Sequence, residues 1–383
     1  MGCSCHNKHC VDSLNEPLRN PSNKPKTFNA KIDNIEQTNI VNIFNSLEIE
    51  NKNENFTIVS KIGGGGFGKT FVVKNKKNDL FILKLTDNKK KFRIAAKESE
   101  LLQKCYHPNI IHYKEIFKKK NENNSILNIN LIIEYANGGD LHDKLNQQIN
   151  GNKYFEENIL INWLMQISLG LSYLHKKIII HRDIKPENIL LLKNGLIKIC
   201  DFGLSRQYKN KSELSKKSTL AGTYCYISPE MKTNNIYNEK TDIYSLGQTF
   251  YNFIRTKKDI YSSNFINLVK SLTENDQELR PSADKILENP IVKEQMKSFL
   301  DKYDYKNSMA YKIMENLKKN EKINNISEDQ FIMDVKNEWD SLFNQKENIN
   351  ISDFERRNNR DLDILMCIIN KKLNENKNNI EIS

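Results

Sequence analysis

The most informative part of this chain is the run His181-Arg182-Asp183-Ile184-Lys185-Pro186-Glu187-Asn188, followed by Asp201-Phe202-Gly203. Asp183 could accept the proton of a hydroxyl group, and Lys185 could steady a moving phosphoryl group. Asn188 and Asp201 offer the hard oxygen ligands that suit magnesium. These are the polar groups that phosphoryl transfer needs, because that reaction is catalysed mainly by positioning and charge neutralisation.

A glycine cluster upstream has the features of a phosphate-binding loop. It runs Ile62-Gly63-Gly64-Gly65-Gly66-Phe67-Gly68-Lys69-Thr70 between two segments in which apolar and polar residues alternate. Glycine suits such a loop because a turn without Cβ atoms lets backbone amides approach phosphate groups. Glycine clusters also form ordinary hairpins. Its position upstream of Phe81-Ile82-Leu83-Lys84 favours the phosphate-binding interpretation.

Taken together, these segments resemble the motifs of eukaryotic protein kinases in the serine/threonine branch, and they are most similar to the NIMA-related kinases. The resemblance implies ATP and Mg²⁺ as cofactors, with protein serine and threonine side chains as substrates. It implies that Asp183 is the catalytic base, with Lys185, Asn188 and Lys84 as the other catalytic residues, and that Asn188 and Asp201 bind magnesium. Lys84 would contact phosphates and pair with Glu98.

The segment Leu131-Ile132-Ile133-Glu134-Tyr135-Ala136 resembles the hinge between the two lobes of a kinase. By this resemblance, Ile133 would lie behind the adenine ring. The backbone groups of Glu134 and Ala136 would bind the edge of the ring, and Leu190 would form the floor of the site.

The polar segment from Leu204 to Leu220 resembles an activation loop switched by phosphorylation. Thr219 is the first candidate for the modified residue, with Ser215 and Ser218 next, and Arg182 could pair with the phosphate. Downstream, the resemblance implies that Thr223 bonds the catalytic aspartate. It also implies a buried ion pair between Glu230 and Arg280.

One interval departs from the family. Gly247 of the motif Asp242-Ile243-Tyr244-Ser245-Leu246-Gly247 is followed by Arg280 after about half the usual separation. The helix that commonly serves as a docking platform for substrates and regulators is therefore expected to be missing or reduced.

The expected fold is α+β and bilobal, with a small antiparallel sheet and one helix in the N-lobe and a larger, mainly helical C-lobe. We place the kinase domain at residues 56–293, with its N-lobe at 56–136 and its C-lobe at 137–293. Residues 1–55 form a mostly disordered lead. Residues 294–383 form a helical extension, in which Phe331, Val335, Trp339 and Leu342 fall on one face of a predicted helix.

Composition sets limits on localisation and partners. The net charge of +11 reflects abundant lysine without interleaved aromatic residues, so we expect no nucleic-acid partner. The scattered cysteines favour a cytoplasmic protein.

Met1-Gly2-Cys3-Ser4-Cys5 resembles an acylation signal, with myristate on Gly2 and palmitate on Cys3 or Cys5, which would add membrane association. The alternatives are an inert tail and a soft metal site.

The main alternative to an active enzyme is a pseudokinase that binds nucleotide or partners as a scaffold. The shortened interval after Gly247 and the residue Ile82, at a position where alanine is common, leave that alternative open. The sequence does not indicate the oligomeric state.

Overall fold

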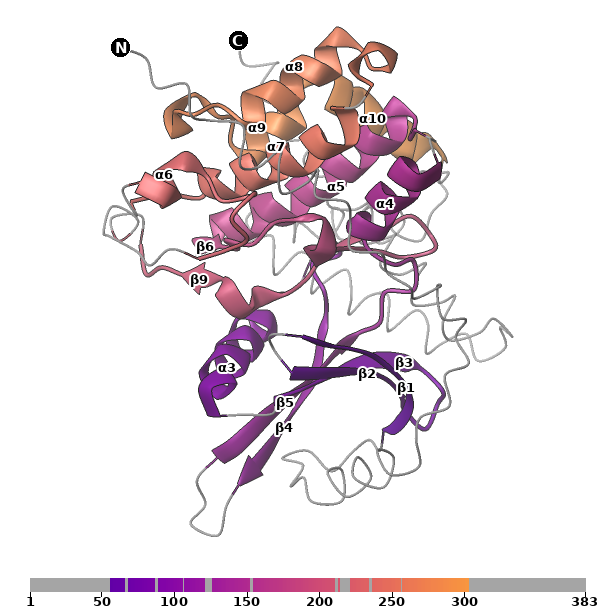
Figure 1. Ribbon diagram of the computed structural model, residues 1–383, viewed down its shortest axis with the longest axis vertical. Coiled ribbons are helices and arrows are strands. Elements are labelled where there is room, and N and C mark those ends of the chain that lie inside the picture. The colour runs from indigo at the N-terminus through magenta and orange to yellow at the C-terminus, as the bar shows by residue number, and fades with distance from the viewer. Residues whose placement is uncertain are drawn as a thin grey trace, which may run out of the picture.

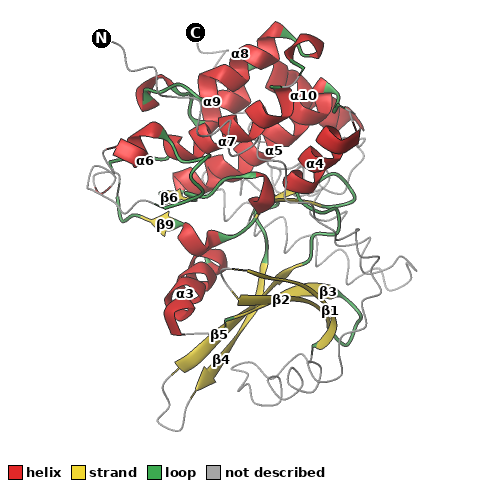
Figure 2. Cartoon of the chain, in the orientation of Figure 1, coloured by secondary structure: helices red, strands yellow, loops and turns green. Residues whose placement is uncertain are grey.

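The computed structural model describes residues 56–302, with gaps at 66–67, 87–88, 106, 121–125, 152–153, 211–212, 214–220, 234–235 and 256. Within these residues the chain forms two lobes, a sheet with one long helix and a larger group of helices (Figure 1). Figure 2 shows the same division by secondary structure, with strands concentrated in one lobe and helices in the other. The bilobal α+β prediction is confirmed.

The small lobe is built on a five-stranded antiparallel sheet with the strand order β1-β2-β3-β5-β4. Alternation of apolar residues gives the sheet two different faces. One face packs its own small core, which includes Phe71, Leu83 and Ile132. The other face, with Ile82 packed against the core of the large lobe, points toward the space between the lobes. The strands are β1 (Thr57–Gly65), β2 (Gly68–Lys74), β3 (Leu80–Leu85), β4 (Tyr113–Lys120) and β5 (Ile126–Glu134).

Helix α3 (Lys89–Gln103) lies beside this sheet and next to the large lobe (Figure 1). Among its buried residues, Ala95, Glu98, Ser99 and Leu102 repeat at the spacing of one helix face. The helix begins at Lys89, and its lysine-rich first turn carries no apolar period that would reveal the start from the sequence.

The loop after α3 fixes the small lobe to the large one. The side chain of Asn109 donates to the Gln166 side chain at 3.2 Å and to the Ile197 carbonyl at 3.0 Å. The backbone of Ile199 bonds to residues on either side of Ile110, at 2.9 Å in both cases. The position of α3 is therefore tied to the strands that carry the site.

The large lobe is organised around α5, in which nearly every residue from Leu160 to Leu174 is buried. Helices α9 and α10 pack against it, and α7 contacts it at the centre of the lobe. The helices are α4 (Leu141–Gly151), α5 (Glu157–Lys176), α6 (Pro229–Thr233), α7 (Lys240–Ile254), α8 (Ser263–Leu272), α9 (Ala283–Glu288) and α10 (Pro290–Lys302).

Two small strand pairs lie between the helices and the sheet. They are β6 (Ile179–Ile180) with β9 (Arg206–Gln207), and β7 (Ile189–Leu191) with β8 (Ile197–Ile199). The turn η1 (Pro186–Asn188) lies between β6 and β7, and the turn η2 (Phe202–Leu204) lies between β8 and β9. The two informative sequence runs therefore form loops on a rigid base of short strands.

The connection from α7 to α8 is short, as predicted. Its described residues form only the 3₁₀ turn η4 (Lys258–Ile260), with no α-helix between Ile254 and Ser263. The connection is held against the start of α5. Ser262 bonds through its amide and hydroxyl to the Glu157 carboxylate, the hydroxyl at 2.6 Å, and the Tyr261 hydroxyl donates to the Phe155 carbonyl at 3.2 Å.

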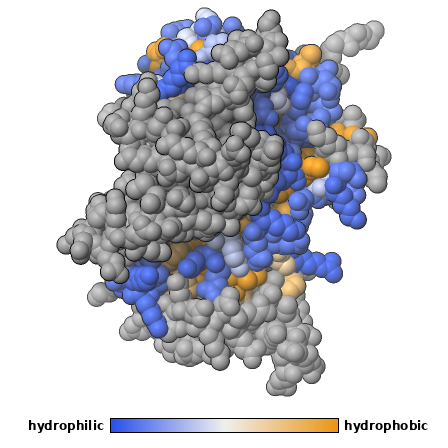
Figure 3. All heavy atoms as spheres, turned by 180° about the vertical axis from the view of Figure 1, so that it is seen from behind, coloured by the Kyte–Doolittle hydropathy of each residue, from blue (hydrophilic) through white to orange (hydrophobic). Residues whose placement is uncertain are grey.

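The part of the chain that the structure describes contains no helix long and apolar enough to cross a membrane. On the face opposite to that of Figure 1, the visible surface of the described residues is mainly hydrophilic, with scattered hydrophobic residues (Figure 3).

Candidate active site

The sheet register aligns the residues that would enclose a nucleotide. Thr70 pairs with Lys84, which pairs with Leu131, and Ile82 pairs with Ile133 on the same face. Residues that are directly opposite in adjacent strands point to the same side of a sheet. Lys84 and Ile133 therefore share one surface, which is the arrangement that a single nucleotide site would need.

The glycine-rich segment forms the ends of the first hairpin. Gly63, Gly64 and Gly65 lie in β1, and Gly65 is paired with Gly68 at the start of β2. Ile62 and Lys69 at its two sides are exposed. Gly66 and Phe67, at the tip of the hairpin, lie outside the described residues.

Lys84 forms an ion pair with Glu98 of α3, with Nζ and Oε1 2.6 Å apart. Burial alone would lower the pKa of Lys84, but the carboxylates of Glu98 and Asp201 outweigh it, so its pKa is raised and the ammonium group stays charged. Glu100, the next acidic residue of α3, pairs instead with Lys104 on the exposed side of the helix. The predicted Lys84–Glu98 pair is confirmed, and the influence of Asp201 places that carboxylate near the same cation.

Asp183 lies at the centre of a converging set of donors. Its Oδ1 accepts from the amide and the hydroxyl of Thr223, at 3.0 and 2.9 Å. Its Oδ2 accepts from the Asn188 side chain at 2.9 Å and lies 2.8 Å from Lys185 Nζ. Burial acts to raise the pKa of Asp183, but the bonds from Lys185 and Thr223 prevail and hold it below its usual range, so the carboxylate is ionised at neutral pH.

Asn188 and Asp201 are suited to hold a hard cation. The Asn188 Nδ2 donates to both the carbonyl and the carboxylate of Asp183, which directs its Oδ1 elsewhere. The Asn188 carbonyl also accepts from the Cys200 amide at 3.0 Å, so this residue is close to Asp201 in space. One amide and one carboxylate oxygen are too few for a complete magnesium site, but they fit an ion whose other ligands are phosphates and waters.

The catalytic loop is anchored from below by Asp242 of α7, which is fully buried. Its Oδ1 accepts from the Arg182 amide at 2.8 Å, and its Oδ2 accepts from the His181 amide and the His175 ring, both at 2.9 Å. Burial acts to raise the pKa of Asp242, but the bond and charge of His175 outweigh it, so the pKa is lowered.

Arg182 itself has φ 67°, which is a strained conformation for a residue with a side chain. Gly222 of the following segment approaches the same point, with φ 110° and with a position for Cβ only 2.5 Å from the Arg182 carbonyl oxygen. Asp242 and Gly222 thus allow the loop to adopt a shape that its own backbone disfavours.

The hinge is tied to the large lobe by a contact that sequence reasoning missed. Lys198 of β8 is almost fully buried, and its Nζ lies 3.1 Å from Oε2 of Glu134. The same carboxylate oxygen accepts from the His112 amide at 3.1 Å. The signal available in the sequence was a single charge, Lys198, within a strand of isoleucines. Beyond the hinge, Gly138 lies against the Leu191 carbonyl, where a Cβ would stand 2.7 Å from the oxygen.

A second feature missed by sequence reasoning is a group of cations around Arg182. The pKa of Lys97 in α3 is lowered by its burial and by the neighbouring charges of Arg182 and Arg206. The Arg182 guanidinium also donates to the Leu204 carbonyl at 2.7 Å and to the Tyr237 hydroxyl at 2.9 Å. These three cations come from α3, the catalytic loop and β9, so only the folded chain brings them together.

Glu230 and Arg280 form the predicted buried pair. Two parallel bonds of 2.7 Å join the guanidinium to the carboxylate, and Arg280 is 1 % exposed. Burial acts to raise the pKa of Glu230, but the bond from Arg280 overrides it and lowers the pKa. This pair secures the end of the activation segment to the base of the large lobe.

His181 and Cys200 pack within the core beside the site. The His181 ring is fully buried, lies 3.0 Å from the Cys200 carbonyl oxygen and packs edge-on against Phe202. Burial raises the pKa of the Cys200 thiol far above its usual range, which keeps it protonated and unreactive. Leu190 packs at the edge of the large core. Its role as the floor of the adenine site stays a prediction.

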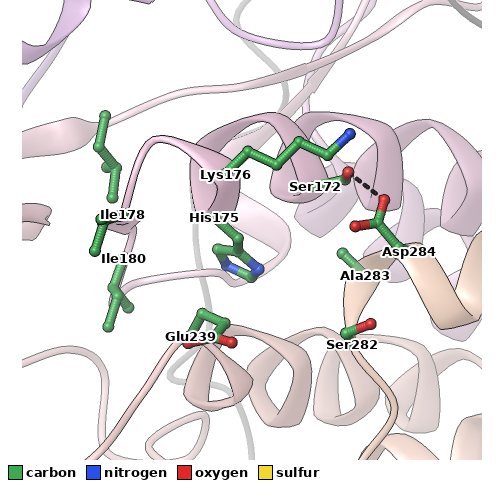
Figure 4. A pocket seen from close by; sticks show the side chains of 10 residues that line it. Ser172, His175, Lys176, Ile178, Ile180, Glu239, Ser282, Ala283 and Asp284 are labelled. Atoms are coloured by element: carbon green, nitrogen blue, oxygen red, sulfur yellow. Dashed lines mark hydrogen bonds between the residues drawn. The ribbon is translucent and has the colours of Figure 1, made fainter. Parts of the chain in front are cut away.

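A pocket of about 390 Å³ lies behind the catalytic loop rather than at the nucleotide site. Figure 4 shows its wall, in which Ser172 donates to Asp284 at 2.6 Å and the His175 ring points into the space. None of the residues that we assign to phosphoryl transfer lines this pocket. Its link to the site is indirect, through the bond from His175 to Asp242.

Several predicted residues lie outside the part of the chain that the structure describes. These are the activation-loop candidates Ser215, Ser218 and Thr219 and the lipidation candidates Gly2, Cys3 and Cys5. The helices expected beyond residue 302 also lie outside it.

Comparison with known protein families matches residues 56–261 to the family described as "Protein kinase domain". This match covers more than half of the chain, and it agrees with the bilobal fold and with the convergence of Lys84, Asp183 and Asp201. The chain belongs to the protein kinase family.

The relatives to which the chain is similar include serine/threonine-protein kinases of the Nek, or NIMA-related, group. It is 37 % identical to human Nek5 over 222 residues, which is 56 % of this chain and 30 % of the relative. It is 33 % identical to human Nek11 over 279 residues, covering 65 % of this chain and 42 % of the relative. The "Putative serine/threonine-protein kinase A" of Trypanosoma brucei brucei is 31 % identical over 268 residues, covering 62 % of this chain and 61 % of the relative.

These matches confirm the predicted resemblance to NIMA-related kinases. The chain spans less than half the length of the human relatives, 30 % of Nek5 and 42 % of Nek11.

Proposed function

We propose that this chain transfers the γ-phosphoryl group of ATP to serine or threonine hydroxyls of proteins. The observation that carries the proposal is the ionised Asp183 carboxylate, surrounded by Lys185, Thr223 and Asn188, together with the Lys84–Glu98 ion pair. Lys84 orients the phosphates, and Asp183 orients the acceptor hydroxyl and takes its proton. Lys185 neutralises charge as the phosphoryl group moves.

Magnesium bound by Asn188 and Asp201 would neutralise and bridge the phosphates of ATP. The choice of serine and threonine over tyrosine rests on Lys185, placed two residues after Asp183, and on the names of the relatives. Because serine and threonine have short side chains, their hydroxyl groups would reach Asp183 only when the backbone of the substrate protein lies close to Thr223.

The test is incubation of the full chain with γ-labelled ATP, Mg²⁺ and a mixed protein substrate, followed by phosphoamino-acid analysis. Label on serine and threonine supports the proposal, and Asp201→Asn should abolish it. Label on tyrosine alone, or release of phosphate without labelling of protein, would contradict it.

We further propose that phosphorylation of the activation loop switches this activity. The positive charges of Arg182 and Arg206 act on Lys97 and lower its pKa, and a phosphate on Thr219, with Ser215 and Ser218 as the next candidates, would offset these charges. Phosphosite mapping by mass spectrometry and the Thr219→Ala variant test this step. We expect a loss of activity of about tenfold or more, in line with a change of 1–3 charge-assisted hydrogen bonds. Full activity of a variant lacking all three hydroxyls would refute it.

Association with membranes through acylation of Gly2 stays a prediction from the sequence. Gly2→Ala should move the protein from the membrane fraction to the soluble fraction. Unchanged partitioning would rule out acylation as the anchor.

A further inference from the structure

The shortened connection between α7 and α8 leaves an apolar and basic surface at the end of α7. We define this α7 face by five residues, Tyr251, Arg255, Lys257, Lys258 and Ile260. Tyr251 is 38 % exposed and Ile260 is 52 % exposed. Because the connection is bonded to the start of α5, the face is a built part of the lobe and not a loose loop.

The face carries an excess of positive charge. Lys258 lies over the Tyr251 ring, with 5.3 Å from Nζ to the ring centroid, and Lys257 lies over the ring of Tyr154 at 4.6 Å. Among the described residues, the buried Nε of Arg255 has no hydrogen-bond partner. Within residues 251–260 the sequence has these three cations and one acidic residue, Asp259. A segment that fits the face must therefore combine apolar side chains with negative charge.

One segment of this chain has that chemistry. In 327–342, the residues Phe331, Val335, Trp339 and Leu342 recur at the spacing of a helix face. Asp334 and Glu338 directly precede Val335 and Trp339 and, at about 100° per residue, fall along one edge of the apolar stripe. The apolar stripe of this segment matches Tyr251 and Ile260 of the α7 face, and its acidic edge matches the lysines of that face.

The other amphipathic stretch, 362–373, fits less well. It carries Lys371 and Lys372 at its end, which would meet cations of the same sign. The linker 303–326 could extend over about 80 Å, which exceeds the diameter of a lobe of this size, so segment 327–342 can reach any part of the surface.

We propose that segment 327–342 docks on the α7 face of its own chain, where family members commonly have a helix. Its apolar stripe covers Tyr251 and Ile260, and Asp334 and Glu338 meet Lys257 and Lys258. The side chain of Asn252, next to Tyr251, donates to the Tyr226 hydroxyl at 3.3 Å, so the docked segment would lie beside the activation segment. This inference does not depend on the proposed catalytic activity.

The proposal is tested by reversing charges and measuring amide hydrogen exchange of the full chain. The exchange is followed by mass spectrometry on peptides from 327–342. We expect Lys257→Glu with Lys258→Glu to speed exchange of this segment about fivefold or more, the size that two exposed ion pairs carry. Adding Asp334→Lys and Glu338→Lys to that variant should restore slow exchange. The matched control is Lys76→Glu with Lys77→Glu, an exposed lysine pair in the turn between β2 and β3, which should change nothing.

Two results would overturn the proposal. Exchange of 327–342 that is equal in the wild type and the Lys257→Glu, Lys258→Glu variant would show that the segment does not rest on this face. Slow exchange that disappears on dilution would assign the face to a second copy of the chain instead. Thermal unfolding of each variant, with a midpoint within about 2 °C of wild type, confirms that the exposed substitutions leave the lobe folded.

Discussion

Replacement of Asp242 by asparagine tests how the catalytic loop keeps its shape. The carboxylate accepts from two loop amides and from the His175 ring, so both of its oxygens are occupied by donors. An asparagine side chain must turn its NH₂ group toward one of them. The less costly orientation faces the Arg182 amide and leaves that buried N–H without an acceptor.

The structure allows an estimate of the cost. An unsatisfied buried donor costs about 1–3 kcal/mol, and each of the two remaining bonds loses about 1 kcal/mol when its acceptor becomes neutral. The total is about 3–5 kcal/mol, and it removes the bond that compensates for the strained φ of Arg182. We expect the loop to relax away from its active shape.

Steady-state phosphoryl transfer to a serine peptide and thermal unfolding measure both consequences of Asp242→Asn. We expect kcat to fall about 100-fold, the equivalent of roughly 3 kcal/mol, and KM for ATP to change little, because Lys84 and the hinge are untouched. The unfolding midpoint should fall by about 10 °C. Asp259→Asn, at an exposed aspartate, is the matched control and should leave both values unchanged.

The effect should also depend on pH. The folded-state pKa of Asp242 is lowered, so its contribution to stability is present above the unfolded pKa of about 3.9 and is lost as pH falls through the folded value. The difference between wild type and Asp242→Asn should therefore stay constant from neutral pH to about pH 4 and shrink below it. A variant with wild-type kcat and an unchanged midpoint would refute this reasoning.

Three further substitutions have expected outcomes of their own. Arg280→Met should destabilise the protein by about 3–5 kcal/mol in urea unfolding, because it leaves Glu230 as a buried charge, whereas the double change to methionine should regain most of the loss; a cost below about 1 kcal/mol for the single change would count against the pair. Glu98→Gln should lower the pKa of Lys84 and raise KM for ATP about tenfold, and an unchanged KM in steady-state assays would show that the pair does not position phosphates. Lys198→Met should lower the unfolding midpoint by several degrees and weaken ATP binding in calorimetry, because the Glu134 carboxylate loses its buried cation; an equal affinity for ATP would show that Lys198 does not support the hinge.

Much of the site was predictable because the motifs of this sequence have the same residue types and internal spacing as the kinase motifs that they resemble. Asp183, Lys185 and Asn188 lie within one loop, and their contacts follow from its local shape. The partner of Lys84 was also predictable, since Glu98 and Glu100 point to different faces of one helix and only one of these faces the sheet.

The contacts that were missed join residues whose chemistry is ordinary when it is read alone. Lys198 is one of many lysines, and its burial depends on the pairing of β7 with β8 and on the position of the hinge. Lys97 and Arg206 are distant in sequence, and only the folded chain brings them near Arg182. The short connection after α7 was predicted by comparing the interval from Gly247 to Arg280 with that of the kinase family, whereas the aromatic and basic surface that the connection exposes was not predicted.

The central claim is that Asp183 acts as the base in transfer of a phosphoryl group from ATP. The most direct measurement is a single-turnover reaction of the full chain with γ-labelled ATP and Mg²⁺, comparing wild type with Asp183→Asn at saturating nucleotide. The rate of protein labelling should fall at least about 100-fold while the Kd for ATP stays the same, since general-base catalysis contributes about 10²–10⁴-fold. Labelling by the variant at a rate within threefold of wild type would contradict the assignment.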